Sequence, residues 1–266
     1  MWTFGIVNVT RDSFSDGGRF LRPEAALEHA NRLLADGADV LDVGAESTHP
    51  DAEDVSADEE LRRLQPVVEQ LLERGATVSI DTCKPVVMRA MTALGVHWLN
   101  DVGGFRHPAA MEAAAAAPAK VRFVVMFSRS QGPRAGRPDA DAAPVLRELH
   151  AFFAERLQSF AAAGIARERL VFDPGMGFFV GRTAAPSLEI LKRLSELRAF
   201  GVPLLVSVSR KSFLGEVTGR PVAERGPATL AAELWALRNG ASFVRTHDVA
   251  ALRAAWAVEQ AIAGAS

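Results

Sequence analysis

Cysteine is almost missing from this chain of 266 residues, and so are long hydrophobic runs. The one cysteine, Cys83, cannot form an intrachain disulfide or a cysteine-rich metal site. So low a cysteine content is typical of proteins in a reducing compartment. No run of about 18 apolar residues is present, so the sequence predicts no membrane-spanning helix. The N-terminus enters a strand-like segment without the basic and apolar regions of a secretory signal. We therefore expect a cytoplasmic protein with no membrane partner.

An excess of charge of either sign is also missing. The chain has 30 lysine and arginine residues against 32 aspartate and glutamate residues, a formal net charge of -2. Without a general basic field we expect no nucleic-acid partner, and a phosphate site must come from a local cluster. The composition, 48% hydrophobic and 23% charged, is ordinary for a globular protein. No linker-like stretch divides the chain, so residues 1–266 are expected to form a single domain.

What the sequence does contain is a repeated pattern of eight short apolar segments, most of which end at a polar residue. Stretches with helical periodicity lie between them, which is typical of parallel strands joined by crossover helices. Eight such units predict an α/β fold, a (β/α)8 TIM barrel. The predicted strands are Trp2–Asn8, Val40–Asp42, Thr77–Asp81, His97–Asn100, Arg122–Met126, Leu170–Asp173, Pro203–Ser209 and Phe243–His247. The predicted helices are Pro23–Ala35, Ser56–Arg74, Lys84–Leu94, His107–Ala117, Ala142–Ala163, Ser187–Phe200, Pro227–Asn239 and Val249–Ala263.

In a TIM barrel the carboxyl ends of the strands form the active face. Two long loops rich in glycine and proline, residues 10–22 and 129–144, follow strands one and five and are predicted to act as lids. The residues at or just after the strand ends are the first candidates for the site, namely Asn8, Asp42, Asp81, Asn100, Asp173, Lys211, Arg245 and His247.

Three of these candidates predict a pocket for a flat heterocycle. Asp81, Asn100 and Asp173 end three strands and should point into one cavity. Two carboxylates and an amide suit a ring that is rich in N–H donors, because a carboxylate accepts two parallel N–H bonds. A metal site is the rival interpretation, and the lack of a nearby histidine makes it the less favoured one.

The segment after the second strand is harder to assign. Asp42 lies in a buried run, and for Asp42 and Glu46 a structural role is as good an interpretation as a functional one. Ser47 and Thr48 are able to donate hydrogen bonds to an anion. His49 alone is weak evidence, since a lone histidine is more often an ordinary surface residue.

A local basic cluster follows strands seven and eight, where TIM barrels often bind phosphate. Arg245 and His247 are two residues apart on a strand and share one face. Lys211 lies in a segment with two hydroxyls and a second cation, Arg210. Asn8 at the end of strand one is able to offer an amide oxygen to a hydrated Mg²⁺, which needs only one or two protein ligands besides phosphate.

Eight motifs, in order over nearly the whole chain, resemble dihydropteroate synthase. They are Gly5–Thr10, Asp12–Gly18, Glu46–Thr48, Asp81–Thr82, Asn100–Val102, Asp173–Gly175, Ser209–Ser212 and Arg245–Asp248. The resemblance implies a transferase that condenses 6-hydroxymethyl-7,8-dihydropterin pyrophosphate with p-aminobenzoate, giving dihydropteroate and pyrophosphate with Mg²⁺ as cofactor. It also implies a homodimer through the last helices, where apolar positions are Leu230, Leu234, Leu237 and Trp256.

The resemblance assigns roles by position. The predicted pterin pocket consists of Asp81, Asn100, Asp173 and Lys211. The predicted pyrophosphate and Mg²⁺ site consists of Asn8, Arg245 and His247, which with Lys211 are the expected catalytic residues. The predicted p-aminobenzoate side consists of Thr48, Phe178 and Ser212.

Several positions depart from the usual family pattern. His49 stands where most members have arginine, and Ser207 where most have glycine. Phe178 is followed by a second ring, Phe179, as in the sulfonamide-resistance branch of the family. We therefore expect Phe179 to border the p-aminobenzoate pocket and to make the enzyme insensitive to sulfonamides. The alternative is that Phe179 only fills the core.

Two other functions share parts of this pattern. A methyltetrahydrofolate-binding methyltransferase has the same barrel and pterin pocket, but it has no use for Asn8 or for the Arg245 and His247 cluster. A non-catalytic pterin-binding paralog would keep Asp81 and Asp173 and lose the phosphate site.

Overall fold

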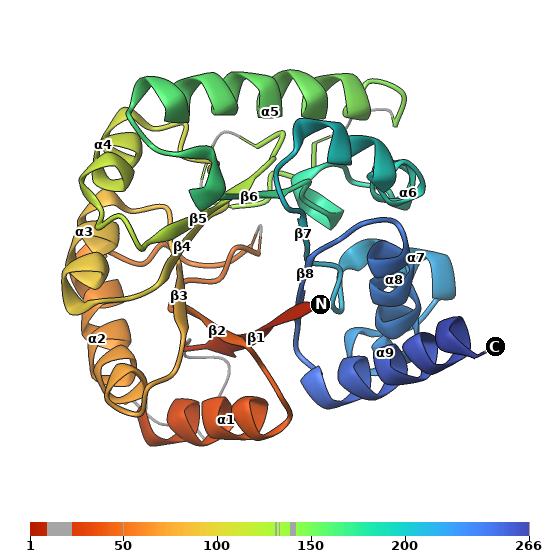
Figure 1. The fold of residues 1–266 in the computed structure, drawn as a ribbon, viewed down its shortest axis with the longest axis horizontal. Helices are drawn as coiled ribbons and strands as arrows, with labels where there is room; N and C mark the ends of the chain where they lie inside the picture. Colours follow the sequence, from red (N-terminus) through yellow and green to blue (C-terminus); the bar gives the residue numbers. More distant parts are fainter. Residues whose placement is uncertain (10–22, 50, 131, 133, 139–141, 266) are drawn as a thin grey trace.

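The structure is a computed structural model that describes residues 1–9, 23–49, 51–130, 132, 134–138 and 142–265. In this part of the chain, eight parallel strands form a nearly closed barrel with helices around it (Figure 1), so the predicted fold is confirmed. The strand order is β6-β5-β4-β3-β2-β1-β8-β7, and an isolated bridge between Phe172 and Leu204 links the two remaining edges. The predicted lid over residues 10–22 lies outside the described residues.

The strands agree with the predicted ones except at the seventh. They are β1 (Trp2–Asn8), β2 (Val40–Gly44), β3 (Val78–Asp81), β4 (Trp98–Asp101), β5 (Arg122–Met126), β6 (Leu170–Asp173), β7 (Leu205–Val206) and β8 (Phe243–Thr246). The predicted strand Pro203–Ser209 is too long, because Val208 accepts a hydrogen bond from the Lys211 backbone N–H at 3.1 Å and the chain turns away from the sheet there.

The helices lie outside the barrel. They are α1 (Pro23–Ala35), α2 (Ala57–Glu73), α3 (Pro85–Leu94), α4 (Pro108–Ala116), α5 (Val145–Ala162), α6 (Ala184–Lys192), α7 (Ser212–Thr218), α8 (Gly226–Arg238) and α9 (Val249–Gly264). The predicted helix Ser187–Phe200 is divided into α6 and a 3-10 helix, Leu194–Phe200. The short helix α7 was not predicted, and it ends at Gly219, whose φ of 68° is the left-handed stop common at helix ends.

The inside of the barrel consists of layers, because every second residue of a strand points inward. The lowest layer is an apolar floor of buried residues: Phe4, Val40, Trp98, Val124, Val171, Leu205 and Phe243. The Trp98 ring meets Phe4 and Phe243 edge-on, with centroids 5.2 and 5.7 Å apart. Two residues further along four of these strands the inward positions are polar: Asp42, Asn100, Asp173 and Arg245. The sequence alternation thus places a polar layer directly above an apolar floor.

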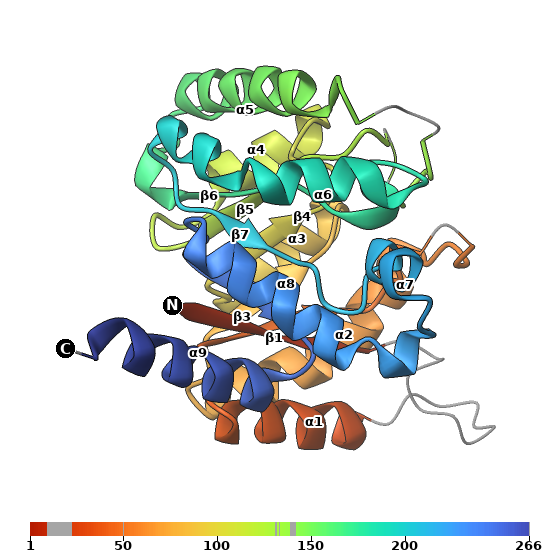
Figure 2. The same cartoon turned by 90° about the vertical axis from the view of Figure 1, so that its right-hand side faces the viewer.

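The polar layer lies toward the end of the barrel opposite the chain termini. In Figure 2 both termini lie on the left, whereas α7, which follows β7, lies on the right. That side carries the loops that follow the strands, where the candidate residues are found. None of the helices in the described ranges is long and apolar enough to cross a membrane.

Removing the largest ring of the floor should destabilise the fold strongly. Trp98 is 3% exposed, and Trp98→Ala should lower the free energy of unfolding by about 3–5 kcal/mol, because it deletes buried ring contacts and leaves a cavity. Urea denaturation measures this loss. Trp2, which is 48% exposed, is the matched control, and Trp2→Ala should cost clearly less. Equal losses for both variants would contradict the floor assignment.

Candidate active site

Arg245 lies at the centre of the polar layer and bonds two carboxylates. Its Nε donates to Asp42 Oδ2 at 2.5 Å, and its Nη2 donates to Asp81 Oδ2 at 2.8 Å. The Nδ2 of Asn100 donates to the same Asp42 oxygen at 3.2 Å. Asp42 is fully buried, so its role is to hold Arg245 and Asn100. The structural interpretation of Asp42 is therefore the better one.

A deep cavity of about 20 Å³ lies above this layer. Asp81, Asn100, Asp173 and Lys211 all line it, as the sequence predicts, and Arg245 does so too. The Oδ1 of Asn100 is buried and has no hydrogen-bond partner among the described residues. The rest of the lining includes four apolar side chains, Val102, Met126, Met176 and Phe179. The cavity therefore combines acceptors and a cation with apolar faces.

Burial shifts the pKa values of the charged groups around this cavity. It raises the pKa of Asp81 to about 7. The positive charge of Arg245 lowers this pKa, and the negative charge of Asp42 raises it further. It also raises the pKa of Asp173 to about 6, although the Gly175 backbone N–H donates to this carboxylate at 2.8 Å. Burial and the charge of Arg245 lower the pKa of Lys211 to about 8. These three groups therefore titrate close to neutral pH.

His247 is part of a second group, next to Ser209. The Nδ1 of His247 lies 2.9 Å from Ser209 Oγ, which also accepts from the His247 backbone N–H at 3.2 Å. Burial and the charges of Arg210 and Arg245 lower the pKa of His247 to about 3. The imidazole is neutral at ordinary pH, so the prediction that His247 adds positive charge to the basic cluster is wrong. It contributes a hydrogen-bonding group instead.

A wider cavity of about 500 Å³ opens beside the deep one. The predicted residues that line it are Asn8, Thr48, Asp81, Phe178, Phe179, Lys211, Ser212, Arg245 and His247. His49 lies on its wall too. Ser207 and Arg225 also line it, although neither was predicted as a site residue. Ser207 follows β7 in the inward register, so strand alternation was a signal that could have identified it.

Phe179 forms a wall shared by the two cavities. It lines both of them, is 3% exposed, and lies 4.9 Å from the Lys211 ammonium, measured to the ring centroid. Phe178 is half-buried and lines only the wider cavity, where its ring lies 6.3 Å from that of His49. The second phenylalanine is therefore both well packed and part of the site.

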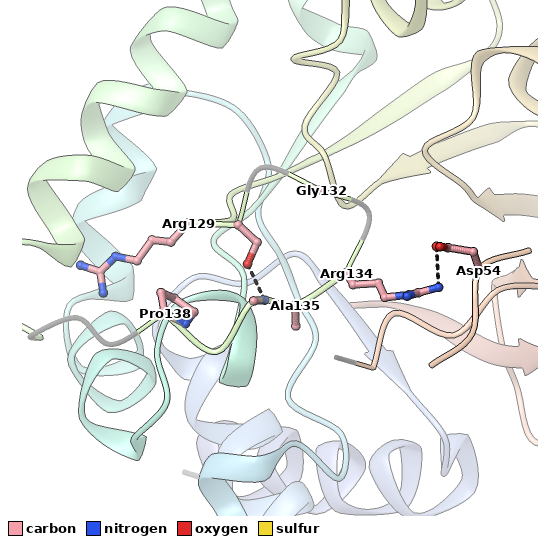
Figure 3. A pocket seen from close by; sticks show the side chains of 8 residues that line it. Asp54, Arg129, Gly132, Arg134, Ala135 and Pro138 are labelled. Carbon is pink, nitrogen blue, oxygen red and sulfur yellow. Dashed lines mark hydrogen bonds and ion pairs between the residues drawn. The ribbon is translucent and has the colours of Figure 1, made fainter. Parts of the chain in front are cut away.

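The loop after β5 joins the loops after β2 and β6. The Ala135 backbone N–H donates to the Thr48 carbonyl at 3.1 Å, and the Arg137 N–H donates to the Phe178 carbonyl at 3.2 Å. Arg134 pairs with Asp54 at 2.7 Å across a third cavity, of about 420 Å³ (Figure 3). These contacts fix the backbone that carries Thr48 and Phe178. They join residues far apart in sequence, which no local pattern could have predicted.

Glu46 has a structural role outside the deep cavity. Its carboxylate contacts the Lys84 ammonium, which also bonds the buried Glu60 at 2.6 Å. The other Glu46 oxygen accepts from the Val55 backbone N–H at 3.1 Å, which ties together the two ends of the loop after β2. Burial raises the pKa of the neighbouring Cys83 to about 12, so this thiol is not a nucleophile at neutral pH.

Comparison with known proteins agrees with this geometry. Residues 4–247 match the family described as pterin binding enzyme. The chain is 48% identical to dihydropteroate synthase type-2 from Escherichia coli over 97% of this chain and 95% of the relative. It is 45% identical to dihydropteroate synthase type-1 from Escherichia coli over 98% and 93%.

Solved structures give the same result. A dihydropteroate synthase from Xanthomonas albilineans with 4-aminobenzoic acid superposes with a TM-score of 0.91, at 43% identity over 100% of this chain and 94% of that one. The same enzyme in complex with 7,8-dihydropteroate superposes with a TM-score of 0.87, at 41% identity over the same shares. The chain therefore belongs to the dihydropteroate synthase family of pterin-binding enzymes.

Proposed function

We propose that this protein condenses 6-hydroxymethyl-7,8-dihydropterin pyrophosphate with p-aminobenzoate, and that dihydropteroate and pyrophosphate are the products. The observation that carries the proposal is the deep cavity, where two carboxylates, an unpaired amide oxygen and a lysine meet apolar side chains. The wider cavity adjoins it and has room for the second substrate and the leaving group. The related structures with 4-aminobenzoic acid and with 7,8-dihydropteroate support both substrate classes.

The pterin ring would bind in the deep cavity. Its N–H edges suit Asp81, Asp173 and the Asn100 oxygen, because carboxylate and amide oxygens accept from parallel donors. The cavity holds about 20 Å³, so it must widen before a pterin ring can bind. Lys211 and Phe179 line both cavities, so the deep cavity can widen toward the wider one.

The pyrophosphate would lie toward Asn8, Arg245 and His247. In the neutral His247, Nδ1 is able to accept a hydrogen bond from the Ser209 hydroxyl. The proton then lies on Nε2, which is able to donate a hydrogen bond to a phosphate oxygen. Arg245 is held by two carboxylates and is thus fixed before the leaving group develops charge. No protein nucleophile is required, since the weakly basic aniline nitrogen attacks the methylene carbon as its C–O bond breaks.

The residues fit a magnesium ion that depends on the substrate. Among the described residues, no group of three or more His, Cys, Asp or Glu side chains could hold a metal. Asn8 alone would offer an amide oxygen, which is enough for a hydrated Mg²⁺ that also binds phosphate. When bound, Mg²⁺ neutralises charge on the leaving pyrophosphate.

Release of pyrophosphate tests the reaction. The purified protein should release pyrophosphate only when both the dihydropterin pyrophosphate and p-aminobenzoate are present, and a coupled enzymatic assay measures this. Asp173→Asn should lower the affinity for a pterin without phosphates by about tenfold or more, because one charge-assisted hydrogen bond is worth roughly 1.5–3 kcal/mol. Pterin binding without turnover would favour the non-catalytic paralog instead.

The pH dependence of pterin binding provides a control on that assignment. Protonation removes the charge of a carboxylate and turns one of its two acceptor oxygens into an O–H donor. The pKa values of Asp81 and Asp173 are raised to about 7 and about 6. Calorimetry should therefore show the affinity falling as the pH decreases from 7.5 to about 5. The decrease should be smaller in Asp173→Asn, which lacks one titrating group. A pH-independent affinity would contradict the pocket assignment.

We also propose that the enzyme discriminates against sulfonamides, with Phe179 as the main cause. A sulfonamide replaces the planar carboxylate of p-aminobenzoate with a tetrahedral sulfonyl that carries a substituent. The Phe179 ring is packed between the two cavities, and Lys211 lies against it, so a bulky substituent on that side would have to displace both. A difference of about 1.4 kcal/mol is enough for a tenfold preference.

The wild-type enzyme should bind sulfonamides weakly, and Phe179→Gly should restore inhibition by about tenfold or more. The Michaelis constant for p-aminobenzoate should change by less than about threefold. Phe178→Gly is the matched control, because Phe178 lines only the wider cavity and its loss should weaken p-aminobenzoate binding instead. Strong sulfonamide inhibition of the wild-type enzyme in steady-state assays would exclude this role for Phe179.

A homodimer through α8 and α9 is the proposed assembly. These helices expose Trp235, Val258 and Ile262 at 47%, 60% and 68%, whereas Leu237, one of the positions suggested by the sequence, is buried in the core. Sedimentation should give twice the chain mass of 28.5 kDa, and Val258→Glu should shift the protein toward monomer because it buries a charge at the interface. A monomeric wild-type protein at micromolar concentration would disprove the assembly.

A further inference from the structure

A strained turn lies between β7 and α7, directly beside the site. The Lys211 backbone N–H donates to the Val208 carbonyl at 3.1 Å, which closes a four-residue turn. Arg210, the third residue of this turn, has a φ of 58°. A positive φ at that position favours glycine, because a Cβ makes the left-handed region unfavourable. The turn therefore needs support from outside its own four residues.

The two neighbours of Arg210 both face the site. Ser209 bonds His247 through its hydroxyl, and Lys211 lines the deep cavity. If φ of Arg210 relaxed to a negative value, the peptide planes on either side would rotate. Lys211 would then leave the deep cavity and Ser209 would leave His247. The conformation at residue 210 thus decides the position of two side chains of the site.

The start of α8 and the residue just before it hold both peptide groups of Arg210. The Oγ1 of Thr229, in the first turn of α8, accepts from the Arg210 backbone N–H at 3.0 Å. Arg225, which immediately precedes α8, donates from Nη1 to the Arg210 carbonyl at 3.0 Å. Thr229 is 5% exposed, so its hydrogen bond lies out of water. One side chain fixes the N–H of residue 210 and the other fixes its C=O.

Helix α7 leaves space for the Arg225 guanidinium. A Cβ on Gly215 would lie 2.3 Å from Arg225 Nη2 and 2.5 Å from Cζ, which is too close for any side chain. Glycine at 215 therefore lets the guanidinium pass α7 and reach the turn. Gly215→Ala would push the flexible end of Arg225 away from the Arg210 carbonyl while every residue of the turn stays unchanged.

We propose that Thr229, assisted by Arg225, is a positioning residue that holds Arg210 in the left-handed conformation and thereby aims Lys211 into the deep cavity and Ser209 at His247. Neither side chain needs to touch the pterin for this role. The proposal rests on the proposed function for its binding readout only, because the conformation of the turn can be measured separately.

A double-mutant cycle at residue 210 separates positioning from general stability. Arg210→Ala and Arg210→Gly both remove the guanidinium, but only glycine adopts a positive φ without strain. Thr229→Val should weaken binding of a pterin without phosphates by about three- to tenfold in the wild type and in Arg210→Ala, the loss expected for one hydrogen bond. In Arg210→Gly the same change should cost less than about twofold. Calorimetry measures each affinity.

Matched variants complete the design. Thr229→Ser keeps the hydroxyl and should retain wild-type affinity. Thr92→Val is the control, because Thr92 is also buried in a helix and its hydroxyl, within the described part of the chain, bonds only the Met88 and Arg89 carbonyls of the same helix. It should lower stability without changing affinity. Gly215→Ala should weaken pterin binding through Arg225, which provides an independent test if Thr229→Val does not fold.

Equal losses for Thr229→Val in the glycine and alanine backgrounds would overturn the proposal, as would an unchanged affinity in both Thr229→Val and Gly215→Ala. If the wild-type protein bound no pterin, the proposed function would fail, and a crystal structure of Thr229→Val would then decide the turn. Loss of the positive φ at residue 210 in that variant supports the positioning role. Retention of it, with Lys211 still in the deep cavity, excludes that role.

Discussion

The geometry of the barrel mouth depends on the ion pairs between Arg245 and the carboxylates of Asp42 and Asp81. In the sheet, β8 is separated from β3 by β1 and β2, so the guanidinium reaches across the inside of the barrel. Without it, the buried carboxylate of Asp42 and the partly buried one of Asp81 would repel each other across neighbouring strands, and removing one partner of a buried pair typically costs about 3–5 kcal/mol. Arg245 thus holds the ends of β2, β3 and β8 together, and its guanidinium is a fixed positive charge beside the wider cavity.

Local sequence pattern was sufficient to predict the barrel and the main residues of its polar layer. Strand alternation places Asp81, Asn100 and Asp173 on the inner face, and this alternation does not depend on contacts with distant parts of the chain. The role of Asp42 could not be decided in the same way, because its partner Arg245 lies 203 positions later. The contacts that join the loop after β5 to Thr48 and Phe178 were missed for the same reason. Such contacts exist only once the strands are in place.

The folded environment also gives some correctly identified residues a charge or a backbone conformation that differs from the prediction. His247 belongs to the site, but its neighbours are cations and it is largely buried, so it is neutral where a positive charge was expected. The end of the seventh apolar run reads as a strand in sequence, yet Lys211 bonds back to Val208 and the run ends in a turn. Both differences lie at the candidate active site. Functional sites are where the conformation and charge expected from local sequence are most often overridden by the surrounding structure.

The two ends of the site differ in how they are built, and this difference has a consequence for how the enzyme can change. Most polar groups of the deep cavity come from strands that are fixed by ladder hydrogen bonds, by the apolar floor and by Arg245. The outer wall of the wider cavity comes from loops that hold one another by backbone hydrogen bonds, such as those from Ala135 to Thr48 and from Arg137 to Phe178, and by partly exposed ion pairs such as that of Arg134 with Asp54. A change on a strand disturbs several buried charges at once, whereas a change in a loop alters one wall. Substitutions are therefore tolerated better in the loops than on the strands, and in the function that we propose the loop end is the one that contacts p-aminobenzoate and its analogues.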